Sequence, residues 1–78
     1  MTDELFPELA QQLDAESWDW LQTNLPTIAD SIQSAVKRGA TPDGVRMFVL
    51  NRCGSHRREL AQRCQAAARY LRGLREMA

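Results

Sequence analysis

Residues 49–60 read VLNRCGSHRREL, and the Gly54–Ser55 pair inside this stretch separates two segments that both have helical patterns. Cys53 and His56 flank the pair, and arginines follow it. Glycine ends helices because it adopts a left-handed backbone conformation at little cost, and serine caps the helix that comes next. We therefore predict a stop at Gly54, a cap at Ser55, and a turn that lets the two segments pack together.

The segment after this turn predicts a long helix over about residues 56–76. Small and apolar residues recur at three- and four-residue spacing, which favours one buried helix face. That stripe consists of Leu60, Cys64, Ala67, Leu71 and Leu74. The opposite face is polar and basic, and we expect it to be open to solvent. It consists of Arg58, Gln62, Gln65, Arg69 and Arg72.

The segment before the turn predicts a helix over about residues 42–53, with Thr41 as its cap and Pro42 in its first turn. The segment is apolar almost all round, which is typical of a central helix. We therefore expect this helix to occupy the centre of the fold. If it lies at the surface instead, Met47 and Leu50 form an exposed binding patch.

Further upstream, Pro26 opens another helix, and Gly39 ends it as a left-handed cap. No strand-like alternation and no linker interrupts the chain. The predicted fold is therefore all-α, a compact bundle of four to five helices in one domain over residues 1–78. The expected core consists of Leu9, Leu13, Trp18, Leu21, Ile28, Ile32, Val36, Val45, Phe48, Val49, Leu60, Cys64, Ala67 and Leu71.

Two helices are predicted before Pro26. The first is short and is capped by Thr2 or Asp3 or, since proline is tolerated only in a first turn, begins near Phe6. Asp14 is expected to cap the second helix, over about residues 15–24.

Two tryptophans on the helix over residues 15–24 point in nearly opposite directions. Trp18 and Trp20 are separated by about 160° around its axis, so both cannot enter one simple core. Trp20 is expected either to pack beneath the first helix or the C-terminus, or to anchor an interface with a partner.

The net charge of zero hides a strong division of charge along the chain. Residues 1–36 carry seven acidic side chains and no Lys or Arg, whereas residues 37–78 carry all ten bases and three acids. The halves therefore carry charges of −7 and +7. This division predicts either salt bridges from the acidic helices to Arg57, Arg63 and Arg75, or contacts between the acidic end of one molecule and the basic end of another.

Metal binding and catalysis find little support in the sequence. Cys53, His56 and Cys64 offer three ligands, whereas a closed structural zinc site needs four. Known catalytic motifs are missing, and a bundle of this size leaves little volume for a substrate cleft. We expect no enzyme activity, no metal and no cofactor, and two reduced cysteines that are at least partly buried.

The location of the protein is predicted from its apolar runs and its start. The longest unbroken apolar run is short, and the acidic start has no hydrophobic signal region. We therefore expect a cytoplasmic protein without a membrane partner.

A helix-turn-helix reader of DNA is one candidate function. The helix up to Cys53, its glycine turn and the Arg- and Gln-rich helix that follows have the required order. Leu50 stands where a small residue is usual, and Arg63 stands where an apolar residue is usual. The isoelectric point near 6.5 is also low for a DNA-binding domain.

We therefore favour a small non-enzymatic protein–protein interaction module, either adaptor-like, self-assembling or inhibitor-like, and keep DNA binding as the alternative. Its partner is expected to be another protein or copies of itself. The expected partner-binding residues are Arg58, Gln62, Gln65, Arg69, Arg72, Trp20, Met47 and Leu50. In size and charge layout the chain resembles the death-fold adaptors and the effector-associated adaptor domains of bacterial conflict systems. No motif of these families is matched residue by residue.

Overall fold

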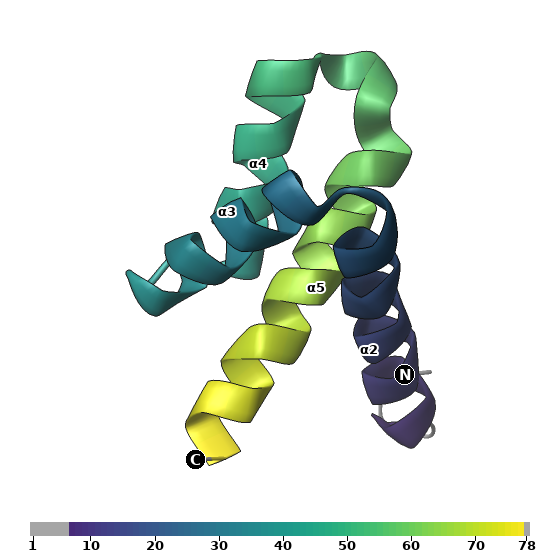
Figure 1. Cartoon of the computed structure of the whole chain (residues 1–78), viewed down its shortest axis with the longest axis vertical. Helices are drawn as coiled ribbons and strands as arrows, with labels where there is room; N and C mark the ends of the chain where they lie inside the picture. Colours follow the sequence, from purple (N-terminus) through teal and green to yellow (C-terminus); the bar gives the residue numbers. More distant parts are fainter. Residues whose placement is uncertain (1–6, 78) are drawn as a thin grey trace.

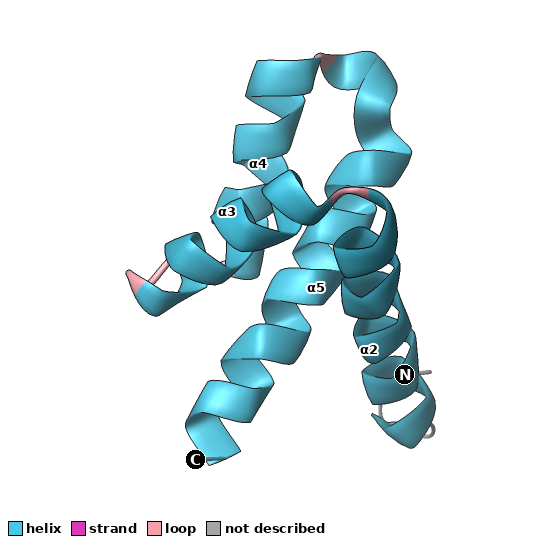
Figure 2. Cartoon of the chain, viewed as in Figure 1, coloured by secondary structure: helices cyan, strands magenta, loops and turns pink. Residues whose placement is uncertain are grey.

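The computed structural model describes residues 7–77, and this part of the chain is helical with no strand (Figures 1 and 2). The α-helices are α2 (Pro7–Asn24), α3 (Pro26–Lys37), α4 (Pro42–Cys53) and α5 (Arg58–Met77). A short 3-10 turn, η1 (Ser55–Arg57), leads from α4 into α5. The prediction of an all-α bundle is confirmed.

The centre of the bundle is α5. Helix α2 packs along one side of α5, α4 packs along another, and α3 contacts both α5 and α2. This arrangement depends on side chains of α5 that are small enough to let three neighbours approach closely. The fully or almost fully buried residues of α5 are Ala61, Cys64, Ala67 and Ala68.

The prediction that the helix over residues 42–53 is central is therefore wrong. Val45 and Val49 of α4 enter the core, whereas the Met47 and Phe48 side chains are 47% and 59% exposed. Apolar residues on every side of a helix do not force it into the centre, because many apolar side chains remain on protein surfaces. The alanine-rich α5 takes that place instead, since it accepts neighbours on several sides.

The start of the described chain is one continuous helix, so the two predicted helices before Pro26 are one. Asp14 lies inside α2 instead of capping a new helix, and its carboxylate pairs with Arg69 of α5. The first described residue of α2 is Pro7, a position that suits proline in a first turn. The predicted cap near Thr2 lies outside the described residues.

The predicted ends of α3 and α4 are confirmed. Gly39 follows α3 with a φ of +96°, and its amide donates to the carbonyl of Val36 at 3.0 Å. At the start of α4, the Thr41 hydroxyl accepts a hydrogen bond from the amide of Gly44 at 3.0 Å. Proline, threonine and glycine signals act over a few residues, so they were readable without knowledge of the tertiary fold.

The turn at Gly54 accepts no side chain. Its backbone has φ +93° and ψ 157°, a region that residues with a Cβ rarely adopt. A Cβ added here would also lie 2.9 Å from Cε1 of His56. Gly54 ends α4 as predicted, but Ser55 begins η1 instead of capping α5 directly.

The far end of α5 is tied to α3. The Nη1 atom of Arg75 donates to the carbonyl oxygens of Val36 and Lys37, at 2.8 and 3.0 Å. These carbonyls belong to the last turn of α3, where carbonyl groups lack partners within the helix, so the guanidinium caps the helix end. The Val36 carbonyl accepts a second hydrogen bond, from the Gly39 amide. The expected salt bridge from Arg75 to an acidic helix is replaced by this cap.

The predicted core is confirmed in its main part. Seven of its residues are buried, and four more are partly buried against them: Trp18, Ile28, Leu60 and Leu71. Leu13 and Phe48 are exposed, against the prediction, and the side chain of Leu9 is not described. The residues that the sequence reading missed are the alanines Ala29, Ala61, Ala66 and Ala68.

Two truncations test this assignment of core and surface. Leu21→Ala is expected to lower the free energy of unfolding by about 2–5 kcal/mol, because Leu21 is fully buried. Phe48→Ala is expected to cost about 1 kcal/mol or less, since most of its side chain is already in water. Urea unfolding followed by circular dichroism measures both, and equal losses would contradict the surface position of α4.

Candidate functional site

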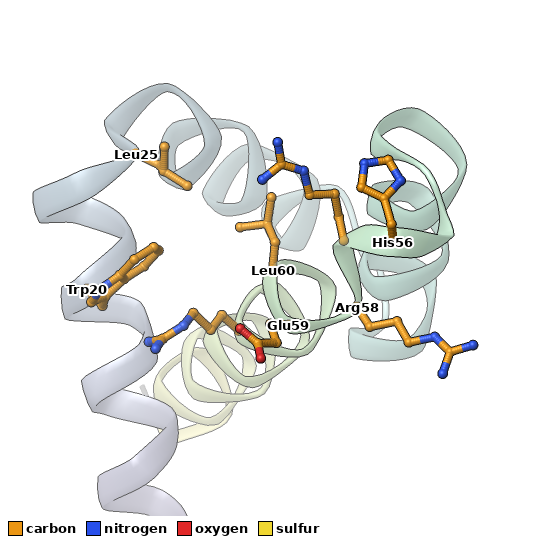
Figure 3. Close-up of a pocket in the computed structure, with 8 residues that line it drawn as sticks. Trp20, Leu25, His56, Arg58, Glu59 and Leu60 are labelled. Atoms are coloured by element: carbon orange, nitrogen blue, oxygen red, sulfur yellow. The ribbon is translucent and has the colours of Figure 1, made fainter.

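A hollow of the structure lies between α2 and the start of α5, and we call it the basic groove (Figure 3). It has a volume of about 770 Å³. A neighbouring hollow of about 540 Å³ continues along α2 towards Leu13 and shares Glu59 and Arg63 with the basic groove. Together they run along the contact between the acidic α2 and the basic α5.

Apolar side chains from three places in the chain line one part of the basic groove. Trp20 comes from α2, Leu25 from the link between α2 and α3, and Leu60 from the first turn of α5 (Figure 3). Leu25 and Leu60 are partly buried against the core, whereas Trp20 is 36% exposed. These side chains form the apolar floor of the groove, and Leu25 and Leu60 connect this floor to the core.

Trp20 is held at the surface by an arginine. The Cζ atom of Arg63 lies 4.3 Å from the centroid of the Trp20 ring, which is a close cation–π contact. Of the two predictions for Trp20, packing beneath the first helix or the C-terminus is not what the described residues show. The predicted salt bridge at Arg63 is likewise replaced by this stacking.

Positive charge surrounds the apolar floor. The groove is lined by three arginines and one acid, Glu59, which gives a net charge of +2 with His56 neutral. Arg57 and Arg58 belong to η1 and the first turn of α5, where the helix dipole adds further positive potential. Figure 3 shows the Arg58 side chain pointing away from Trp20, so it extends the positive charge to the outer rim.

The outer face of α5 carries the remaining polar residues that the sequence analysis selected. Arg69 makes a two-point contact with Asp14 of α2, with Nη2–Oδ1 at 3.1 Å and Nε–Oδ2 at 3.3 Å. The Gln65 amide donates to Asp43 of α4 at 2.8 Å. Acids of both neighbouring helices therefore already occupy the middle of this face.

Folding back of the acidic half onto the basic half thus occurs at one place among the described residues. That ion pair involves Arg69 and not the predicted Arg57, Arg63 or Arg75. An exposed pair of this kind contributes about 0–1 kcal/mol to stability. The charge of the two halves is therefore still largely available for contacts outside the molecule.

Met47 and Leu50 do not form the expected common patch. Met47 is exposed on α4, whereas Leu50 is turned inwards and packs against the core. The larger apolar feature of α4 is Phe48, which lines a groove of about 660 Å³ between α3 and α4. The sequence analysis placed Phe48 in the core and therefore missed this groove.

The two cysteines are free and differ in their surroundings. Cys53 is exposed, against the prediction of partial burial, and Cys64 is fully buried. Burial raises the pKa of the Cys64 thiol from 9.0 to about 11, and the neighbouring Cys53 adds to this shift. Among the side chains that the structure describes, no three of His, Cys, Asp or Glu gather where they would hold a metal ion. None of the described helices has the length and apolar character to cross a bilayer.

The raised pKa of Cys64 predicts a loss of stability in alkaline solution. Above about pH 9 the unfolded chain releases this proton, whereas the folded chain keeps it until about pH 11. The free energy of unfolding should therefore fall across this range, and Cys64→Ala should reduce the fall. Urea titrations at several pH values measure the effect. It would be contradicted if the free energy of unfolding fell equally steeply with pH in the variant. A thiol reagent at neutral pH should modify Cys53 quickly and Cys64 only on unfolding.

Comparisons with family models, with curated proteins and with solved structures find no match to this chain. The resemblance to death-fold and effector-associated adaptors therefore rests on size and charge layout alone.

The structure brings together three of the residues selected from the sequence. Trp20 and Arg58 line the basic groove, and Gln62 lines its continuation. The sequence analysis did not select His56, Arg57 or Arg63 as partner-binding residues. The signal for His56 and Arg57 was their position directly after the Gly54 turn. Nothing local identified Arg63, because its place depends on how α2 packs against α5.

Proposed function

We propose that this protein is a small interaction module that binds an acidic, partly apolar segment of a protein partner in the basic groove. The proposal is carried by one observation: an apolar floor built around Trp20 lies among three arginines with one acid. A purely apolar ligand would leave the guanidinium groups without partners, and a purely acidic one would leave the floor uncovered.

The two parts of the groove have different roles in this proposal. The apolar floor supplies most of the affinity, because tryptophan at a supported surface position is a frequent centre of binding energy. The arginines orient the ligand and select against basic partners, since guanidinium groups pair with carboxylates through two parallel hydrogen bonds. Arg63 already holds Trp20 in place, which reduces the entropy lost on binding.

A binding role is proposed in preference to a catalytic one. The groove is lined by arginine, glutamate, histidine and apolar side chains, without a serine, cysteine or threonine next to a base. The proposal therefore assigns no reaction to His56, and treats it as a polar neighbour of the Gly54 turn.

DNA binding is the less favoured alternative. A helix-turn-helix reading requires the outer face of α5 to contact bases and phosphates. Asp14 and Asp43 lie beside that face and engage Arg69 and Gln65, so they would repel a phosphate backbone. This arrangement favours a protein ligand over a nucleic acid.

The proposal predicts binding of an acidic amphipathic peptide. A fluorescein-labelled peptide of glutamate and leucine should bind, whereas the same peptide with lysine in place of glutamate should not. The double variant Arg57→Glu/Arg58→Glu should weaken binding by about tenfold or more, which corresponds to about 1.4 kcal/mol. Fluorescence anisotropy measures each affinity, and circular dichroism checks that the variant remains helical.

A matched control has the same charge change at another exposed place. Lys37→Glu/Arg38→Glu alters the end of α3, outside the basic groove, and should leave the peptide affinity nearly unchanged. Equal losses of peptide affinity in both variants would show that overall charge, and not the basic groove, determines binding. Binding of a short DNA duplex at about 50 mM salt, with a steep loss at higher salt, would support the DNA alternative instead.

A further inference from the structure

We infer that the segment bound in the basic groove is residues 2–6 of a second copy of this chain, so that the protein assembles head to tail. The inference rests on the function proposed above and names the partner of the same groove. Residues 2–6 read TDELF, two acids followed by two large apolar side chains. This combination matches the arginines and the apolar floor of the groove.

The match extends to the individual parts of the groove. Asp3 and Glu4 supply carboxylates for Arg57 and Arg58, and the two apolar residues that follow supply cover for the floor around Trp20. The described part of α2 adds further acids behind this segment. Complementary charge of this kind fixes the register of a contact and the choice of partner.

The distance along α2 keeps Asp3 and Glu4 from Arg57 and Arg58 of the same chain. Trp20 follows Pro7 by thirteen helical residues, which corresponds to about 20 Å along the axis. Even a fully extended chain carries Asp3 only about 14 Å from Pro7. Arg57 belongs to η1 and lines the basic groove together with Trp20, and η1 lies towards the Asn24 end of α2 in Figure 1. The contact is therefore made between molecules.

The geometry also decides the kind of assembly. The donor segment precedes Pro7 at one end of α2, and the basic groove lies beside the other end. One contact therefore leaves each pair with a free groove and a free donor segment. Such a heterologous contact continues into rings or filaments and does not stop at a symmetric dimer.

The charge balance of the chain agrees with this arrangement. Charges of −7 and +7 lie in the two halves, and among the described residues only Asp14 and Arg69 form an ion pair. A contact made by a short segment is expected to be weak, with a dissociation constant of roughly 10 µM to 1 mM, and to weaken further with salt.

The test uses two variants that each remove one end of the contact. Asp3→Lys/Glu4→Lys removes the donor segment, and Arg57→Glu/Arg58→Glu removes the groove. Sedimentation velocity should show assemblies of the wild-type protein that grow with concentration, and monomers for each variant alone. In an equal mixture, Asp3→Lys/Glu4→Lys is paired with Arg57→Gln/Arg58→Gln, because the lysines would find new carboxylate partners on the glutamate variant. This mixture should form a 1:1 heterodimer and nothing larger, since only one complementary pair of ends remains.

Three results would overturn the inference: a monomeric wild type up to about 1 mM, assembly of the Asp3→Lys/Glu4→Lys variant alone, or no heterodimer in the mixture. The glutamate–leucine peptide tests the proposed function separately, since its binding to the groove does not require self-assembly. If the peptide binds and the mixture stays monomeric, the module has another partner.

A second measurement covers the case in which the glutamate variant does not fold. Arg57→Gln/Arg58→Gln then also replaces it in the measurement of the groove variant alone, with less disturbance of the first turn of α5. A labelled peptide of residues 1–8 should also bind the Asp3→Lys/Glu4→Lys protein, and the same peptide with both acids replaced by lysine should not. Equal binding of the two peptides would reject the inference.

Discussion

The close packing of three helices against the small-residue face of α5 is the constraint on which the rest of the structure depends. Ala61, Cys64, Ala67 and Ala68 let the neighbouring backbones approach, so a chain of this size forms a core with few large side chains. Among the larger residues whose side chains the structure describes, only Leu21 is completely enclosed. The same constraint moves other large apolar residues outwards. Trp20, Met47 and Phe48 lie at the edges of the packed region, where their side chains remain partly in water.

This outward displacement creates the surfaces that are available for binding. Trp20 stays at the surface beside Arg63, and the basic groove forms where the end of α2 faces the start of α5. A groove built on two helices and a supported floor presents its side chains in fixed positions, which limits the entropy cost of binding. The division of charge along the sequence becomes a spatial division, since the acidic α2 and the basic α5 lie side by side.

The sequence allowed the helix boundaries to be predicted wherever they depend on neighbouring residues. Pro26, Gly39, Thr41 and Gly54 mark ends that the structure confirms, because capping and backbone preference act within one turn. The position of the central helix was predicted wrongly. Alanines add little to an apolar sequence pattern, although their small size decides which helix can be surrounded by its neighbours. The partners of Arg63, Arg69 and Arg75 were also out of reach. Each depends on contacts between segments far apart in the chain.

The corner at Gly54 links the stability of the fold to the position of the groove. Its backbone conformation is one that residues with a Cβ rarely adopt, and a Cβ would also meet the His56 ring. The direction in which α5 leaves this corner also determines where Arg57 and Arg58 stand. A side chain at residue 54 would therefore strain the fold and shift the groove at the same time. Changes in ligand preference that leave the fold intact are expected from the rim side chains.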